Sequence, residues 1–207
     1  MYKVLIVEDD PIAARLFELM VQESKECELS GTLASAALAE AWCLGHPVDL
    51  VLMDVVTAGR ASGLEAASKL KRSMPHIKVL VVTSQPEVDF IERAKSAHVD
   101  GFWYKTASDI SLVELIQRTM SGERVFPASV PEVQLGKALV SDFTPLEVRI
   151  LRELTTGATN AKIASRLGLS DRTVGNNIQS MLSKTGFATR TMLAVAAVDS
   201  GAVISGV

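Results

Sequence analysis

The sequence lacks long hydrophobic runs and contains little cysteine. No apolar stretch reaches the roughly 20 residues that a membrane-spanning helix needs. The opening stretch MYKVLIVEDD does not read as a signal peptide, because its short apolar run ends in three acids. The two cysteines, Cys27 and Cys43, show no metal-binding spacing. We therefore expect a soluble, cytoplasmic protein with reduced thiols and no membrane partner.

Repeats and low-complexity segments are also absent. Hydrophobic residues make up 48% of the 207 residues, which is enough to build buried cores in one or two domains. The charge is uneven along the chain: residues 1–121 carry 12 Lys and Arg against 17 Asp and Glu, whereas residues 142–207 carry 7 against 5. An acidic first part and a mildly basic last part indicate two modules with different partners.

The first 121 residues alternate between short apolar runs and segments of helical periodicity. Strands are predicted over residues 2–7, 29–33, 48–53, 77–83 and 99–105, and helices over about 11–25, 35–45, 62–74, 86–97 and 108–121. Five repeats of strand and helix indicate an α/β domain, in which helices cover both faces of a parallel sheet.

A different pattern begins after residue 121. Residues 122–141 contain two glycines and two prolines without a clean period, and we interpret them as a linker with room for some ordered turns. Helices are then predicted over about 144–156, 160–167, 171–184 and 189–199. Residues 142–207 are therefore expected to form a small all-α domain.

Polar residues follow the predicted strands, all at the same end. Glu8 and Asp9 follow the first strand, Asp54 the third, Thr83 the fourth and Lys105 the fifth. An open parallel sheet binds ligands outside the carboxyl ends of its strands, so these side chains should converge. Clustered carboxylates repel and favour a hard divalent cation such as Mg²⁺, while the lysine and the hydroxyl suit a phosphoryl oxygen. This constellation indicates phosphoryl transfer onto a carboxylate.

The same residues carry a family resemblance. Residues 1–121 resemble the receiver domain of two-component response regulators, in VEDDP, in Asp54 after LVLM, in Thr83 after VLVV and in Lys105 of GFWYK. The resemblance implies a doubly wound, flavodoxin-like, five-stranded sheet in the order 2-1-3-4-5. It also implies that Asp54 accepts a phosphoryl group from the phosphohistidine of a histidine kinase.

The resemblance further assigns roles around Asp54. Asp9, Asp54 and the backbone carbonyl of Val56 would bind Mg²⁺, with Glu8 acting through water. Phe102, three residues before Lys105, matches the position of the aromatic switch residue in the family. On phosphorylation, Thr83 would move toward the new oxygens and Phe102 would follow into the vacated space.

The loop after Asp54 departs from the family pattern. Receivers commonly have a proline four residues past the phosphorylated aspartate and a glycine eight residues past it. Here Ala58 stands at the proline position and Gly63 lies nine residues on. We expect a loop one residue longer and more flexible, which would alter the phosphorylation rate and the lifetime of the phosphoryl group.

Residues 142–207 resemble the four-helix, helix-turn-helix DNA-binding domain of the LuxR and NarL/FixJ family. The stretch FTPLEVRILRELTTGATNAKIASRLGLSDRTVGNNIQSMLSKTGFATRTML follows the family pattern almost throughout. The motif residues are Thr144, Glu147, Leu151, Gly157, Asn160, Ile163, Ala164, Leu167, Ser170, Thr173, Val174, Ile178, Lys184 and Arg190. Together the two modules imply a NarL/FixJ-type response regulator that binds double-stranded promoter DNA and places its second motif helix in the major groove.

That predicted helix, residues 171–184, has an unusual polar face. It carries Gly175, Asn176, Asn177 and Gln179, although a glycine in a helix costs about 1 kcal/mol relative to alanine. Asparagine and glutamine can bond bidentately to adenine, so Asn176 and Gln179 are the first candidates for reading bases. Asn177 lies beside or behind them, and Gly175 would let the backbone approach a base edge.

Other residues of this module are candidates for contacts to the DNA backbone. They are Thr159, Asn160, Arg172, Thr173 and Lys184. The family usually has lysine at position 175 and histidine at position 177, and loss of that lysine weakens the electrostatic share of the affinity. Exposed amides can also be plain neutral surface, and this alternative stays open.

The last predicted helix, in TRTMLAVAAVDSGAV, is apolar beyond one narrow stripe. Core packing explains most of these residues. The excess apolar surface, together with the family resemblance, suggests that Met192, Leu193 and Ala196 pair with their copies in a homodimer. A dimer would read two half-sites.

The leading interpretation is a transcription factor, not an enzyme, in which phosphorylation of Asp54 controls dimerisation and DNA binding. One alternative is a receiver protein whose helical domain mediates protein contacts, and another is a DNA-binding regulator that is independent of phosphorylation. A third is an aspartyl-phosphate phosphatase or transferase. Against an enzyme, His46, His76 and His98 show no partner pattern that would supply a general acid or base.

Overall fold

The computed structural model describes residues 1–84, 90–105, 110–128 and 131–203. They form two compact units, the first centred on residues 1–84 and 91–128 and the second on residues 131–203. Each unit has a hydrophobic core of its own, so the chain has two separately packed parts.

The first unit is built on a five-stranded parallel sheet. Its strands are β1 (Tyr2–Val7), β2 (Cys27–Leu33), β3 (Leu50–Asp54), β6 (Lys78–Thr83) and β7 (Gly101–Tyr104). The strand order is β2-β1-β3-β6-β7, which confirms the predicted 2-1-3-4-5 arrangement of the five main strands. The central strands are continuous apolar runs because both of their faces are covered, and Val4–Val7 are fully buried.

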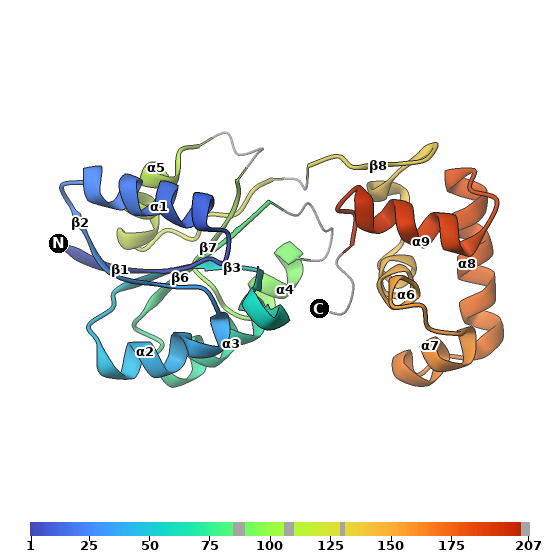
Figure 1. Ribbon diagram of the computed structural model, residues 1–207, viewed down its shortest axis with the longest axis horizontal. Helices are drawn as coiled ribbons and strands as arrows, with labels where there is room; N and C mark the ends of the chain where they lie inside the picture. Colours follow the sequence, from blue (N-terminus) through green and yellow to red (C-terminus); the bar gives the residue numbers. More distant parts are fainter. Residues whose placement is uncertain (85–89, 106–109, 129–130, 204–207) are drawn as a thin grey trace. The chain divides into compact units, whose positions relative to one another are not determined.

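Helices cover both faces of this sheet (Figure 1). They are α1 (Pro11–Glu23), α2 (Ala39–Gly45), α3 (Gly63–Ser73), α4 (Phe90–Ser96) and α5 (Leu112–Met120). Helices α1 and α5 lie on one face, and α2 and α3 lie on the other. The predicted starts of the fourth and fifth helices, near 86 and 108, fall outside the described residues.

Local chemistry sets the helix starts in this unit. The Asp10 side chain caps α1 by accepting hydrogen bonds from the amides of Ile12 and Ala13, at 2.8 and 3.4 Å, and Pro11 occupies the first turn. Ser62 caps α3 in the same way, through the amide of Glu65 at 3.3 Å. Both capping residues lie at the carboxyl ends of strands. They therefore determine where the loops after these strands end and the helices begin.

The second unit is helical, and a short β-hairpin precedes its helices in the sequence. The hairpin strands are β8 (Gln134–Leu135) and β9 (Ala138–Leu139), and the helices are α6 (Pro145–Thr155), α7 (Asn160–Leu167), α8 (Asp171–Thr185) and α9 (Arg190–Asp199). A 3-10 turn, Val140–Asp142, leads from the hairpin into α6. Among the described residues, none of the helices has the length and apolarity to span a membrane.

The segment interpreted as a linker, 122–141, contains ordered structure in its described parts, 122–128 and 131–141. Val125 accepts a hydrogen bond from the amide of Phe102 at 2.9 Å, and Leu135 and Ala138 belong to the core of the second unit. Gly136 turns the hairpin with a φ of 65°, and a Cβ there would lie 2.3 Å from the Thr185 carbonyl oxygen. Two-residue strands are too short to show a period, which explains why the pattern of the sequence missed them.

Candidate functional site

Three carboxylates meet at the carboxyl ends of neighbouring strands. Glu8 follows β1, Asp54 ends β3, and one oxygen from each of Glu8, Asp9 and Asp54 lies within 4.8 Å of the others. The side chains of Glu8 and Asp54 are buried, whereas Asp9 is exposed. The predicted convergence of these acids is thereby confirmed.

Lys105 joins this cluster from the end of β7. Its Nζ donates to Glu8 Oε2 at 2.5 Å and to Asp54 Oδ2 at 3.3 Å. Its backbone amide bonds the Thr83 carbonyl oxygen at 2.8 Å, which links the ends of β6 and β7. One ammonium against three carboxylates leaves an excess of negative charge in a partly buried place.

The pKa of Asp54 is shifted by its surroundings. Burial is the main reason that the pKa of Asp54 is raised to about 7. The Glu8 carboxylate also raises this pKa, while Lys105 and the hydrogen bond from the Val55 amide at 2.7 Å lower it. A buried carboxylate cluster that keeps an excess of negative charge is stabilised by a divalent cation. An all-oxygen donor set of this kind fits Mg²⁺.

Thr83 and Phe102, the two predicted switch residues, are both buried. Thr83 ends β6 and is 1% exposed, and Phe102 lies in β7 and is 2% exposed. The Phe102 ring packs edge-on against Tyr104, with 5.0 Å between the ring centroids. The Phe102 ring is buried in this conformation, and its movement on phosphorylation stays a prediction.

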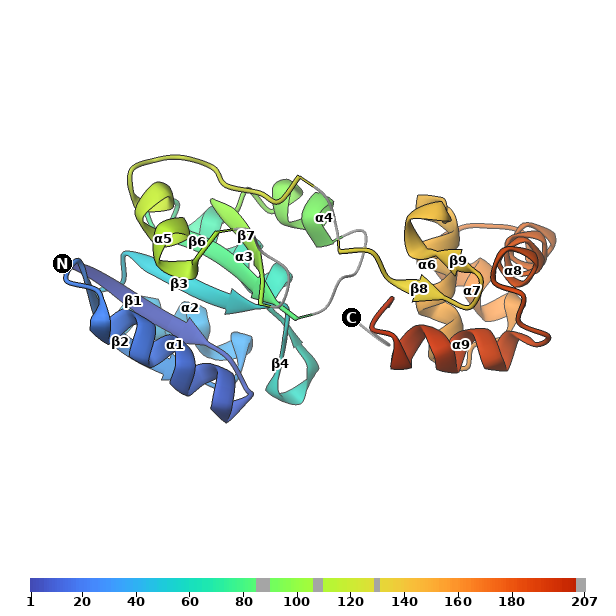
Figure 2. The same cartoon turned by 90° about the horizontal axis from the view of Figure 1, so that it is seen from above.

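The loop after Asp54 forms a small hairpin at the end of β3 (Figure 2). β4 (Val56–Thr57) pairs with β5 (Ala61–Ser62), and a 3-10 turn, Ala58–Arg60, joins them. Gly59 and Arg60 have φ values of 73° and 58°, so the extra residue is absorbed in a left-handed tip. The pairing of β4 with β5 argues against the flexibility that the spacing after Asp54 predicts.

In the second unit, α7 and α8 form the helix-turn-helix. Gly168, in the left-handed conformation with φ 68°, ends α7, and the Ser170 hydroxyl caps α8 through the Thr173 amide at 3.0 Å. On α8 the side chains of Arg172, Asn176 and Gln179 are exposed. Their spacing of four and three residues places them on one face, free for contacts outside the chain.

Asn177 and Gly175 lie differently. Asn177 is half-buried and its Nδ2 donates to the Thr173 carbonyl of its own helix at 2.8 Å. Gly175 faces the start of α7, where a Cβ would lie 3.5 Å from Asn160 Nδ2. Gly175 is therefore at a helix crossing and beside, rather than on, the exposed stripe of α8.

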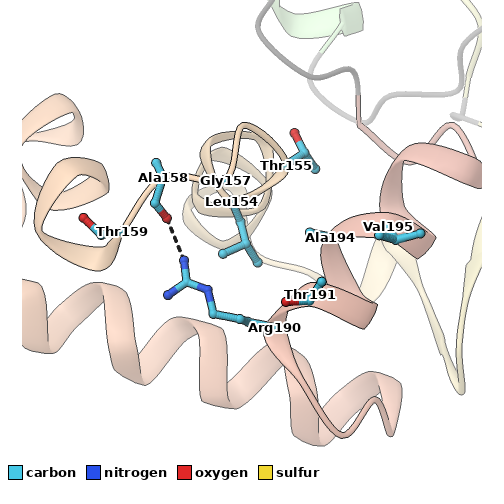
Figure 3. A pocket seen from close by; sticks show the side chains of 9 residues that line it. All are labelled: Leu154, Thr155, Gly157, Ala158, Thr159, Arg190, Thr191, Ala194 and Val195. Carbon is cyan, nitrogen blue, oxygen red and sulfur yellow. Dashed lines mark hydrogen bonds between the residues drawn. The ribbon is translucent and has the colours of Figure 1, made fainter.

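Asn160 in turn is held by α9. Arg190 Nη1 donates to Asn160 Oδ1 at 2.8 Å, and Arg190 Nη2 donates to the Ala158 carbonyl oxygen at 2.7 Å. Figure 3 shows this guanidinium reaching from the start of α9 to the turn before α7, beside a cavity of about 320 Å³. Arg190, which the sequence marks only as a motif residue, thus fixes the first helix of the helix-turn-helix.

Lys184 is engaged inside its own unit. Its Nζ donates to Glu147 Oε2 at 2.7 Å and to the Asp142 carbonyl oxygen at 2.9 Å. Glu147 is buried and also accepts from Ser180 Oγ at 2.8 Å and from the Thr144 amide at 2.7 Å. Lys184 is therefore an internal tie between the end of α8 and the start of α6, and the phosphate contact expected of it stays a prediction.

The remaining candidates for phosphate contacts lie at helix starts. Thr159 Oγ1 caps α7 by accepting from the Lys162 amide at 3.4 Å, and Thr173 Oγ1 lies 2.8 Å from Ser170 Oγ. Thr159 is exposed and Thr173 half-buried. Both belong to the amino-terminal turns of α7 and α8, whose free amides favour anions.

The surface of α9 corrects one prediction. Leu193 is fully buried in the helical core, so it cannot contribute to a dimer surface. Met192, Val195 and Val198 are 50%, 54% and 45% exposed, and Ala196 is half-buried. The spacing of three residues places the exposed side chains on one side of α9, whereas Leu193 points toward the other helices of the unit.

A doubly wound sheet with three acids and a lysine at its strand ends, followed by a helix-turn-helix unit in the same chain, defines a response regulator. Residues 4–117 match the response regulator receiver domain, and residues 141–197 match the luxR family of bacterial regulatory proteins. The chain belongs to the response regulators with a LuxR-type DNA-binding domain, and it is a transcription regulator.

Individual proteins resemble this chain in sequence or in fold. The response regulator protein VraR of Staphylococcus aureus (strain N315) is 30% identical over 198 residues, which cover 93% of this chain and 94% of VraR. RcsB of Salmonella enterica serovar Typhimurium, solved with promoter rprA and the phosphomimetic BeF₃⁻, shares the fold with a TM-score of 0.63 at 18% identity, covering 95% of this chain and 98% of RcsB. A LuxR-family response regulator from Aurantimonas sp. SI85-9A1 matches with a TM-score of 0.56 at 22% identity, over 62% of this chain and 89% of its own.

Proposed function

We propose that a histidine kinase phosphorylates Asp54 and that this reversible change controls promoter binding by the helical unit. The observation that carries the proposal is the Asp54 carboxylate itself. It lies at the end of β3 with Lys105 Nζ 3.3 Å from its Oδ2 and with Glu8 and Asp9 beside it. A carboxylate with an ammonium and two further acids beside it is suited to accept a phosphoryl group, which supports the proposal.

The chain's own groups account for the transfer. An Asp54 oxygen forms a bond to the phosphorus of a phosphohistidine, and the bond from phosphorus to the imidazole nitrogen breaks. That nitrogen keeps the electron pair, so the histidine leaves as neutral imidazole with the proton on its other ring nitrogen. Lys105, which bonds both Glu8 and Asp54, donates to a phosphoryl oxygen, and the Thr83 hydroxyl donates to another. Glu8, Asp9, Asp54 and the Val56 carbonyl would hold Mg²⁺, which supplies charge neutralisation for the phosphoryl oxygens.

Phosphorylation then changes the ends of β6 and β7. The phosphoryl group adds a charge of about −1.5 to −2 at pH 7. Lys105 and Thr83, whose backbones are bonded to each other, both turn toward it. The strand ends that carry them are the first elements to shift, and the populations of monomer and dimer shift with them.

DNA is bound by α8. Asn176 and Gln179, exposed on one face, read base edges, while Arg172 contacts a phosphate from the first turn. A homodimer formed through Met192, Val195 and Ala196 on α9 presents two copies of α8 to two half-sites. Among the related folds, one RcsB structure contains two dimers bound to two parallel DNAs, which supports DNA binding by a dimer.

The protein works in the cytoplasm and turns over no external substrate. The test compares DNA affinity of the wild type and of Asp54→Ala, each with and without a small phosphodonor and Mg²⁺. The wild type with the phosphodonor should bind its promoter more tightly than the other three samples. Equal affinity in all four samples contradicts the proposal, and binding that does not weaken as salt rises favours a helical unit that contacts proteins instead.

A further inference from the structure

Thr57 ties together the segments around the Asp54 site. The side chain is 1% exposed and lies in β4, three residues past Asp54. Its Oγ1 accepts a hydrogen bond from the Ala36 amide at 2.8 Å and donates one to the Ala61 carbonyl oxygen at 3.0 Å. A single buried hydroxyl therefore joins the loop after β2 to both strands of the hairpin that follows β3.

Two further hydrogen bonds strengthen this junction. The Ala58 amide donates to the Ala34 carbonyl oxygen at 2.9 Å, and Ser35 Oγ donates to the Ala58 carbonyl oxygen at 3.1 Å. In the sheet β1 lies between β2 and β3, so the joined loops span the end of β1. Glu8, which follows β1, is bonded to the β2 side through its own amide and the Leu33 carbonyl oxygen at 2.9 Å.

Val56, whose carbonyl is expected to bind the metal, lies between two anchored residues. On one side the Val55 amide donates to Asp54 Oδ1 at 2.7 Å, and the Val55 carbonyl accepts from the Gly63 amide at 2.8 Å. On the other side stands Thr57. At Gly63 a Cβ would lie 1.8 Å from the Asp54 carbonyl oxygen, so only glycine allows the hairpin to close this tightly.

We propose that Thr57 is a positioning residue for the metal site: through the Ala36 amide and the Ala61 carbonyl it holds the Val56 carbonyl in place for Mg²⁺. This inference rests on the proposed function of the Asp54 site. Thr57 touches no reacting atom and acts through the backbone of its neighbours. Its hydroxyl supplies the restraint that a proline gives at the position of Ala58, which is how a longer hairpin without that proline keeps its geometry.

The test measures binding of Mg²⁺ alone to the full chain by isothermal titration calorimetry. Thr57→Val keeps the shape of the side chain but removes both hydrogen bonds, and it should weaken Mg²⁺ binding about 10- to 100-fold. Thr57→Ser keeps the hydroxyl and should stay within about threefold of the wild type. The half-life of the phosphoryl group at Asp54 should change in Thr57→Val and recover in Thr57→Ser.

Thr119→Val is the matched control. Thr119 is also fully buried, in α5, and within the described part of the chain its hydroxyl has no hydrogen-bond partner. Its replacement removes the same group from a buried place away from the hairpin, so Mg²⁺ binding should be unchanged. Equal weakening in Thr57→Val and Thr119→Val would show a general loosening of the domain and overturn the inference.

A second variant covers the case in which Thr57→Val does not fold, as judged by far-UV circular dichroism and thermal unfolding. Ser35→Ala removes one tie of the same junction and should weaken Mg²⁺ binding about two- to tenfold; no change there would overturn the inference. If the wild type binds Mg²⁺ and Thr57→Val binds it equally well, the inference alone fails. If the wild type binds no Mg²⁺, the metal site of the proposed function fails, and the inference fails with it.

Discussion

The Lys184 ammonium lies 2.7 Å from the Glu147 carboxylate, and this pair joins the end of α8 to the start of α6. Glu147 is 3% exposed, and Ser180 and Thr144 also donate to it. A buried carboxylate with this many donors orients the helix that carries the exposed amides. The ion pair therefore sets the direction of α8 relative to the rest of the unit.

Lys184→Met should destabilise the helical unit by about 1–3 kcal/mol, because it leaves the buried Glu147 carboxylate without its cation. Urea unfolding followed by circular dichroism measures the loss. Lys162→Ala, which removes an exposed lysine from α7, is the control and should stay within about 0.5 kcal/mol of the wild type.

The salt dependence of DNA binding tests the role of Lys184 separately. If Lys184 contacted a DNA phosphate, its loss would reduce the slope of log affinity against log salt by about 0.9. We expect an unchanged slope for folded Lys184→Met. A smaller slope in this variant would restore Lys184 as a phosphate contact.

Glu147 should also give the unit a defined acid sensitivity. Burial acts to raise its pKa, but the hydrogen bonds from Lys184, Thr144 and Ser180 hold that pKa below the usual 4.5. A carboxylate with a lowered pKa in the folded state contributes stability that is present above pH 4.5 and is lost as the pH falls through the folded value. The stability difference between the wild type and Glu147→Gln in urea unfolding should therefore shrink below pH 4.5, and a difference that grows on acidification would contradict the assignment.

Asp54→Asn should stabilise the receiver unit when divalent ions are removed with a chelator. Burial raises the pKa of Asp54 from 3.8 to about 7, so ionising it opposes folding. The destabilisation builds up between pH 3.8 and about 7 and is constant above. The thermal midpoint of Asp54→Asn should thus exceed that of the wild type at pH 7.5 and approach it at pH 4. Adding Mg²⁺ should raise the thermal midpoint of the wild type but not that of Asp54→Asn. Equal midpoints at both pH values would show that Asp54 is not desolvated.

Gly175→Lys should increase DNA affinity. A Cβ at this position would make an ordinary contact of 3.5 Å with Asn160 Nδ2, so the backbone accepts a residue other than glycine. We expect tighter binding with a salt slope steeper by about 0.9, from one added phosphate contact. Gly175→Ala is the control: it should stabilise the unit by about 1 kcal/mol without changing the slope. An unchanged slope in Gly175→Lys would place position 175 away from the DNA.

Two substitutions on α9 should separate assembly from folding. Val195→Glu places a charge on the exposed stripe and should shift the phosphorylated protein from dimer to monomer in sedimentation velocity, with the fold retained. Leu193→Ala removes a fully buried side chain and should cost about 2–5 kcal/mol of stability. A dimer that survives Val195→Glu would move the interface to another surface.

Much of the molecule follows from short-range patterns. Continuous apolar runs identify the central strands, and the acids, hydroxyl and lysine that follow them share one end of a parallel sheet, so Glu8, Asp54 and Lys105 converge as predicted. The caps of the last helices, such as Ser170 and Gly168, are equally local. The hairpin at residues 134–139 has too few residues for a period, and the sequence could not reveal it.

By itself, the sequence determined the order of strands and helices, the two modules and the set of acids at the strand ends, because each depends on periodicity or on spacing along the chain. Only the tertiary structure decided what individual side chains do: that Lys184 pairs with Glu147, that Leu193 is buried while Met192 is exposed, and that Thr57 bonds the loop after β2. These outcomes depend on distances between segments far apart in sequence. Packing sets those distances, and a period within one segment carries no information about them.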